Sequence, residues 1–354
     1  MSPPRWVVGA LLVCALAWAP RVLPAQESPS TYTASVRLGM EYDDNAHRVE
    51  TAHAKPDFLT RYFTAFDAVH PIHRNSAATL SLRHGGKIFL DERDADTMLT
   101  QLDLGYRHRL GDYLSMSVDA DIKDRSERLS MRDYNRGGAR LGTALGLGPV
   151  RLGLAGSWRY FAYKPNPMAS THGPQGHAFL RYFATENIAF DTGYTLARRH
   201  SDLPALLLED DFVVLNDDAP RRRDLFHAFR VGTSLRWHLF IDLHYVYSTN
   251  KSNSYGNQLV RHGLELNLTA PLFWEMFLSF RGELQRTRYS DHVLVDDFFV
   301  LDEENRNAVI VAVARPIFDS WELEARYSLY LQEFGVGDPY SRQTFLFALG
   351  YLFD

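Results

Sequence analysis

Charged side chains recur at every second position within apolar stretches of this sequence. In one such stretch Asp119 and Asp121 alternate with Val118 and Ala120. A period of two places the charges on one face of an extended strand and the apolar residues on the other. Charges on a shared face can line a hydrated passage that sorts solutes by charge and size. The alternative is that they pair with one another into a plug that closes a narrow barrel, which would make the protein a structural or surface-binding barrel.

The same phase recurs from one end of the chain to the other, and it defines a set of candidate lining residues. Each member is costly to expose to lipid, so we expect the whole set to face a wet interior. The set is Arg37, Glu41, Arg83, Lys87, Asp103, Arg107, Asp119, Asp121, Arg159, Arg230, Arg261, Glu265, Arg281, Glu283, Glu324 and Arg326.

The sequence contains no recognisable catalytic motif. There is no G-x-S-x-G, no H-E-x-x-H, no P-loop and no glycine pattern for a dinucleotide. The 14 histidines are scattered, and two of them, His84 and His108, fall on the apolar phase of their strands. We therefore predict a protein that is not an enzyme and needs no cofactor. A membrane hydrolase with a site assembled from distant residues is the enzyme alternative.

Two acidic segments share an apolar centre and form an internal echo. They read LLLEDDFVVLNDDAPRRR and HVLVDDFFVLDEENR. Carboxylates such as Asp210, Asp211, Asp296 and Asp297 are the oxygen ligands that a hard divalent cation prefers. The same residues can be solvated acids beside a short hairpin, and the apolar centre can fold back over or into a barrel.

The elements that must position these charges are β-strands. The hairpin Val260–Gln285 shows the pattern most clearly, since apolar and polar residues alternate along both halves. An apolar exterior around a polar interior is typical of a transmembrane β-barrel, whose open edges cannot survive in hydrocarbon. Repeating the pattern predicts an all-β, antiparallel, up-and-down transmembrane barrel of about sixteen strands, with a range of 14–18. The first strand must then pair with the last.

The connections between the expected strands alternate in length. Short turns contain Gly, Pro, Asn or Asp, as at Gly111-Asp112 and Gly148-Pro149. Short turns on one side and long loops on the other are the arrangement of outer-membrane barrels. The long, polar loops are expected at Lys164–Gly176, Ser201–Arg222, Lys251–Gln258, Ser290–Asn305 and Glu333–Ser341.

The N-terminus predicts export from the cytoplasm. Arg5 precedes the apolar run Trp6–Trp18, and Val22-Leu23-Pro24-Ala25 provides a cleavage site before Gln26, which is the plan of a secretory signal peptide. We expect residues 1–25 to be the signal peptide and residues 26–354 to be the barrel. The one cysteine, Cys14, lies inside the signal, so the mature chain cannot form disulfides.

The composition excludes a nucleic-acid partner. The 354 residues have a formal net charge of −5, and the basic and acidic residues are interspersed. The mean hydropathy of −0.26 also argues against a helical membrane protein. The expected location is the outer membrane of a Gram-negative bacterium, with lipid and lipopolysaccharide as the surroundings of the barrel.

The segment GMEYDDNAHR, Gly39–Arg48, resembles the Y-x-D-N signature near the start of Gram-negative porin-like barrels linked to exopolysaccharide secretion. The segments Tyr247–Leu268 and Glu304–Tyr330 are similar to that family in style. The resemblance implies a passive outer-membrane channel for hydrophilic solutes, with polysaccharide as a candidate solute and polysaccharide-export components as candidate partners. It marks Tyr42, Asp44 and Asn45 without assigning them a role.

The C-terminus resembles the terminal strand signal that barrel-assembly machinery reads, which makes that machinery a further expected partner. The chain departs from the signal by ending on Asp354 instead of an aromatic residue. The alternating residues of the resemblance are Phe345, Phe347, Leu349, Tyr351 and Phe353.

Overall fold

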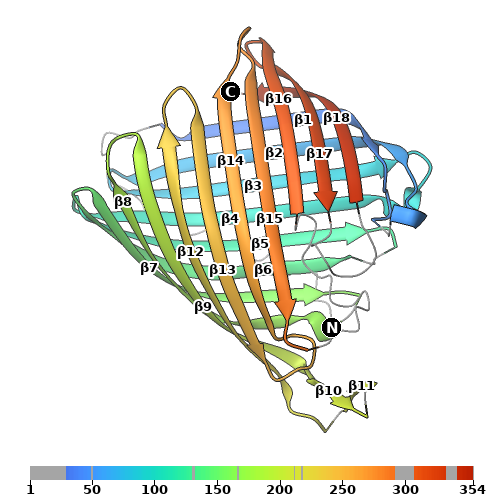
Figure 1. The fold of residues 1–354 in the computed structure, drawn as a ribbon. Coiled ribbons are helices and arrows are strands. Elements are labelled where there is room, and N and C mark those ends of the chain that lie inside the picture. The colour runs from blue at the N-terminus through green and yellow to red at the C-terminus, as the bar shows by residue number, and fades with distance from the viewer. Residues whose placement is uncertain are drawn as a thin grey trace.

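The computed structural model describes residues 29–48, 51–129, 132–165, 167–210, 212–216, 218–291, 307–331 and 341–353. The predicted signal peptide, Asp211, Asp296 and Asp297 lie outside these ranges. In the described residues, sixteen antiparallel strands form one closed barrel (Figure 1). The predicted fold class and strand number are therefore confirmed.

The ring strands pair with their sequence neighbours, except where a small hairpin separates β9 from β12. The strands are Thr31–Asp43 (β1), Asp57–His73 (β2), Ser76–Phe89 (β3), Thr97–Leu110 (β4), Leu114–Glu127 (β5), Tyr134–Leu147 (β6), Val150–Tyr163 (β7), Thr171–Phe183 (β8), Ile188–Pro204 (β9), Arg221–Arg236 (β12), Phe240–Ser252 (β13), Leu259–Pro271 (β14), Phe277–Tyr289 (β15), Asn307–Phe318 (β16), Trp321–Leu331 (β17) and Ser341–Phe353 (β18).

The remaining elements lie in the connections. They are Leu206–Glu209 (β10), Phe212–Leu215 (β11) and the short 3₁₀ helices Thr51–His53 (η1), Arg93–Ala95 (η2) and Pro167–Ala169 (η3). Within the described ranges, no helix combines the length and apolar character needed to cross a membrane. The β10–β11 hairpin extends beyond the end of the barrel, at the lower edge of the view (Figure 1).

The first and last strands close the ring. β1 and β18 pair over ten residue positions, from Ala34 opposite Phe353 to Asp43 opposite Thr344. A backbone edge left unpaired in hydrocarbon would cost several kcal/mol for each exposed group, so this seam is required by the environment that the outer face predicts.

Several strand ends differ from the sequence prediction. Trp274 was expected in a strand, but Trp274 and Glu275 adopt φ of 57° and 60° in the β14–β15 turn, a left-handed conformation that no regular strand contains. β8 begins at Thr171, inside the expected loop Lys164–Gly176. β9 likewise continues to Pro204, and β12 begins at Arg221, inside the expected loop Ser201–Arg222.

The apolar residues lie mainly on the outside of the barrel. Large side chains such as Leu154, Phe347 and Val118 are exposed there, with Phe347 at 71%. Only a small apolar cluster is buried among the described residues, formed by Ala46, Leu59 and Phe89 at one end of the barrel. The fold thus depends on closing a hydrogen-bonded ring, and apolar burial inside it is slight.

Candidate functional site: the inner wall of the barrel

The strand register places all sixteen candidate lining residues on one face of the sheet. Residues opposite one another in a ladder point to the same side, and the face can be followed around the ring. It runs from Arg37 through Gly350 to Glu322, for example, and from Asp103 through Asp121 to Gly138. The exposed apolar residues occupy the other face. The polar face is the concave one, because its side chains meet across an intervening strand.

One part of the inner wall, made by β17, β18, β1, β2 and β3, has its charges joined into ion pairs. We call it the paired wall. Glu41 is 1% exposed and accepts hydrogen bonds from Arg61 at 2.7 Å and Lys87 at 2.6 Å. Arg37 reaches Glu322 at 2.8 Å and also pairs with Glu324. These contacts neutralise charges that would otherwise be costly to bury.

The same wall includes two further ion pairs that involve candidate residues. Arg326 donates from Nε to Glu324 at 2.7 Å, so Glu324 is shared by two arginines. Arg83 contacts Asp67 at 3.2 Å, and both of these side chains are 41% exposed. An exposed pair of this kind contributes little to stability.

Glycines on the inner face let charged side chains reach each other over a strand. Gly350 lies between Arg37 and Glu322 in register. Gly138 lies between Asp121 and Arg159, whose side chains are 2.5 Å apart. A Cβ at Gly138 would lie 2.7 Å from Cδ of Arg159. The absence of a side chain at Gly138 therefore leaves the space in which Arg159 reaches Asp121.

A clasp closes the long-loop end of the β1–β18 seam. It comprises Asp43, Asp44, Asn45, Arg342 and Gln343, and we call it the seam clasp. Arg342 donates from Nε to both oxygens of Asp43, at 2.9 and 3.1 Å, and Asp43 is fully buried. Asp44 accepts from the Gln343 backbone at 2.7 Å, and its own N–H donates to the Gln343 carbonyl at 3.1 Å.

Asn45 completes the clasp. Its backbone N–H donates to Asp43 at 3.1 Å, and its side-chain amide donates to the Ser341 carbonyl at 3.3 Å. Tyr42 packs its ring against Phe58 at 5.1 Å between centroids. Asp44 and Asn45 of the Y-x-D-N signature thus join the end of the first strand to the last, and Tyr42 contacts β2. This structural role was not assigned from the sequence.

The other candidate residues are less connected to one another. Arg230 contacts Glu265 at 2.9 Å, and Arg281 contacts Glu283 of its own strand at 3.2 Å. The remaining members bond to neutral partners, except Arg107, which forms no hydrogen bond or ion pair with a side chain among the described residues. These neutral contacts join Asp103 to Gln101, Asp119 to Ser117 and Arg261 to Thr287.

Sequence reasoning missed several inner-wall charges, among them Arg61, Arg342 and the pair Asp191–His244. His244 Nε2 lies 3.0 Å from Asp191, across Gly232 of the intervening strand. Arg61 follows from the same period of two, but β2 is apolar on both faces near Phe58 and Leu59, which obscures its phase.

The acidic loops do not form a described metal site. Asp210 lies in the turn of the β10–β11 hairpin with φ of 47°, which is the short hairpin that the sequence left as one alternative. The other three candidate acids, Asp211, Asp296 and Asp297, lie outside the described residues. No group of three or more His, Cys, Asp or Glu residues suited to a metal ion occurs in the described ranges.

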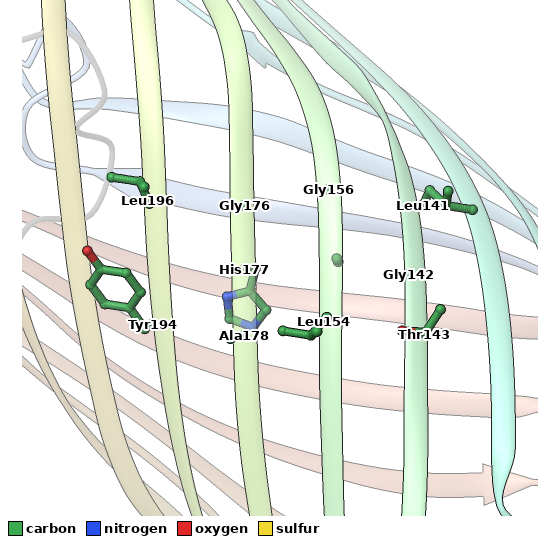
Figure 2. Close-up of a pocket in the computed structure, with 11 residues that line it drawn as sticks. Leu141, Gly142, Thr143, Leu154, Gly156, Gly176, His177, Ala178, Tyr194 and Leu196 are labelled. Atoms are coloured by element: carbon green, nitrogen blue, oxygen red, sulfur yellow. The ribbon is translucent and has the colours of Figure 1, made fainter.

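The outer face carries one apolar groove of about 390 Å³ over β6 to β9. Gly156 and Gly176 lie opposite each other on β7 and β8, between Leu141 and Leu196 in one row (Figure 2). The groove follows from these two missing side chains. The groove is part of the apolar exterior, and no Asp, Glu, Lys or Arg lines it.

In comparisons with known proteins, the chain is similar only to solved structures. No protein-family profile and no curated protein sequence matches the chain. Among solved structures, it is similar to a bacterial polysaccharide outer membrane secretin at 11% identity and a TM-score of 0.45, covering 91% of this chain and 98% of that one. It is also similar to a loop-deleted OmpT, an outer membrane protein of Vibrio cholerae, at 10% identity and 0.48, covering 92% and 99%.

A mutant of the Rhodopseudomonas blastica porin is similar at 8% identity and a TM-score of 0.40, covering 92% of this chain and 100% of the porin. At these values the comparison supplies no correspondence between residues.

Proposed function

We propose that the chain is a channel across the outer membrane of a Gram-negative bacterium that passes hydrophilic solutes. The apolar outer face supports the membrane location, because such a surface on a soluble protein would aggregate. The closed ring supports it as well, since a barrel without edges satisfies every backbone group in lipid. The predicted signal peptide supports export to that membrane.

The direction of the ion pairs favours a channel over a charge-filled plug, and this observation carries the proposal. Ion pairs between strand residues in the described part of the chain lie within one strand, as Arg281 with Glu283 does, or join strands that are adjacent or separated by one. Lys87 of β3 meets Glu41 of β1, and Arg230 of β12 meets Glu265 of β14. The charges therefore pair along the wall, and a ring of about sixteen strands is wide enough to hold water.

Conductance in a planar lipid bilayer tests the channel. We expect the folded protein to produce stepwise, ohmic current increases, while the same protein unfolded in urea before addition produces none. Graded polyethylene glycols should lower the current until they become too large to enter. Folded protein that inserts without any conductance would favour a closed structural barrel and would contradict the channel.

We further propose polysaccharide as the solute, moved by other machinery, on the resemblance of Gly39–Arg48 to the exopolysaccharide-linked barrels. In this proposal polysaccharide-export components and barrel-assembly machinery are the partners. A strain that lacks the protein should retain polysaccharide in the periplasm, measured by fractionation and sugar analysis. Normal surface polysaccharide in that strain would remove polysaccharide from the proposal and leave the channel itself intact.

A further inference from the structure

The inner face of four consecutive strands is strongly cationic. Among the described residues of β6, β7, β8 and β9, six arginines and one aspartate point inward by register. The whole chain has a net charge of −5, so this region has the opposite sign from the average. We call it the cationic wall. Its arginines are Arg136, Arg140, Arg151, Arg159, Arg181 and Arg199.

Two pairs of like-charged side chains lie opposite each other in register, one pair at each end of this wall. We call each pair a like-charge neighbour. Arg151 of β7 lies directly opposite Arg181 of β8 near the short turns. Arg136 of β6 lies directly opposite Lys123 of β5 near the long loops. Like charges opposite each other in a sheet destabilise it. Anions bound from outside the chain would relieve the repulsion within these two pairs.

The side chains at these positions are poorly neutralised. Arg136 and Arg151 are exposed and form no ion pair with any residue that the structure describes. Arg181 donates to the Ser234 hydroxyl at 3.4 Å and lies over the Phe183 ring at 5.3 Å, and its Nε is buried without a partner. Lys123 lies over the Tyr134 ring at 5.8 Å.

Acids do occur on or beside the cationic wall. Asp191 lies opposite Arg181 in register, but its carboxylate contacts Nε2 of His244 at 3.0 Å. Arg159 is paired with Asp121 at 2.5 Å. Asp119 lies opposite Arg140 in register, but its carboxylate accepts a hydrogen bond from Ser117 at 3.1 Å. The unbalanced charge therefore concentrates at the two ends, whereas the paired wall is neutralised along its length by pairs such as Glu41 with Lys87.

We propose that the cationic wall is the anion-binding track of the channel, with one site at each like-charge neighbour. Guanidinium groups bind carboxylate and phosphate oxygens in a bidentate manner, so a solute bearing either group fits. The two sites are separated by ten residue steps along β7, from Arg151 to Phe161, which corresponds to about 33 Å. The track rests on the proposed channel and adds its selectivity.

The reversal potential in a KCl gradient tests the selectivity of the channel. We expect wild-type channels to favour chloride over potassium. Replacing one member of each like-charge neighbour, Arg136→Gln with Arg151→Gln, should lower the permeability ratio by about twofold or more. The matched control, Arg74→Gln with Arg315→Gln, removes the same charge from a turn and from the outer face, so it should leave the ratio unchanged.

The outcomes separate this inference from the channel itself. Channels that conduct with equal or greater preference for potassium would contradict the anion-binding track and leave the channel standing. An equal loss of selectivity in the control would also contradict it, because the effect would then come from total charge. The absence of any conductance would overturn both proposals.

Blocking by soluble probes gives a second measurement that needs only wild-type protein. Oligogalacturonate supplies carboxylates, inorganic polyphosphate supplies phosphates, and a neutral maltooligosaccharide of similar length is the control. We expect both anionic probes to interrupt the current at concentrations where the neutral probe does not. Equal blocking by all three would contradict anion recognition, and blocking by one anionic probe alone would identify which group the track takes.

Discussion

Two deeply buried charges of opposite sign meet at the seam of the barrel. Asp43 is fully buried, and Arg342 is 3% exposed while it lies over the Tyr330 ring at 5.4 Å. Removing one partner of a buried pair leaves the other charge without compensation. The contribution of the Asp43–Arg342 pair to stability is therefore measured by replacing one of the two residues.

Replacing Arg342 with alanine tests the seam clasp. We expect Arg342→Ala to lower the free energy of unfolding by about 3–5 kcal/mol, because the Asp43 carboxylate would remain buried without its partner. Urea unfolding of protein folded in lipid vesicles, followed by tryptophan fluorescence, measures the change.

The matched control removes an arginine from an exposed pair. Arg83→Ala breaks the contact with Asp67, in which both side chains are 41% exposed, and should cost at most about 1 kcal/mol. An equal effect of the two substitutions would show that burial at the seam adds nothing to the Asp43–Arg342 pair.

The sequence predicts the face of a charged residue but not its partner. Glu41 and Lys87 both fall on the inward phase, yet they meet only because β1, β2 and β3 align in one register. Register depends on turn geometry and on packing across strands, which a period of two does not determine. For the same reason Asp43 and Arg342, far apart in the chain, could not be joined beforehand.

At the scale of the element, inner-face glycines decide whether charges can cross a strand. Gly138→Ala should destabilise the barrel by about 1–3 kcal/mol through overpacking and should disrupt the Arg159–Asp121 pair. The added Cβ would lie 2.5 Å from the Trp158 carbonyl oxygen and 2.7 Å from Cδ of Arg159. The same vesicle-based unfolding measurement reports the change.

A glycine on the outer face of the neighbouring strand is the control. A Cβ at Gly156 would meet nothing within 4 Å. Gly156→Ala should therefore be neutral or stabilise the barrel by about 0.4–1 kcal/mol through the unfolded chain. If Gly138→Ala proved equally harmless, the ion pair would not depend on the missing side chain.

Strand existence was easier to predict than strand ends. The alternation in β14 and β15 is strong, but Trp274 fits the apolar phase and still belongs to the turn. β16 likewise continues through Pro316 to Phe318 with a register shift. A proline is tolerated at such an irregularity, because its missing N–H is not required by the ladder there.

At the scale of the whole molecule, the proposed channel requires the apolar outer face of the barrel to meet lipid. Val118→Arg and Ser117→Arg place the same charge on adjacent residues of β5, on the outer and inner faces. We expect Val118→Arg to cost about 2–4 kcal/mol near the bilayer midplane and Ser117→Arg far less.

Folding yield into vesicles and urea unfolding compare the two variants directly. Ser117 neighbours the inner residues Arg107 and Gly142 in register, where an extra arginine meets water. A larger loss for Ser117→Arg than for Val118→Arg would reverse the assignment of the two faces and remove the basis for a membrane channel.

The strand number and the closure of the ring could be predicted because both follow from one repeated pattern and from the environment it requires. The division of the inner face into a paired wall and a cationic wall could not. Arg151 and Arg181 each show only an inward phase, and their opposition depends on the β7–β8 register. Selectivity is thus a property of the assembled ring.

The seam also bears on how the protein is made. The ten-position ladder between β1 and β18 joins the earliest described strand to the latest, so no stretch of the nascent chain can complete the ring before Ser341–Phe353 has emerged. Until then the barrel has two unpaired strand edges, and either edge can pair with another strand. Biogenesis must therefore keep Thr31–Asp43 from pairing with other strands until Ser341–Phe353 arrives, because a prematurely terminated chain keeps an unpaired edge that can pair with another chain.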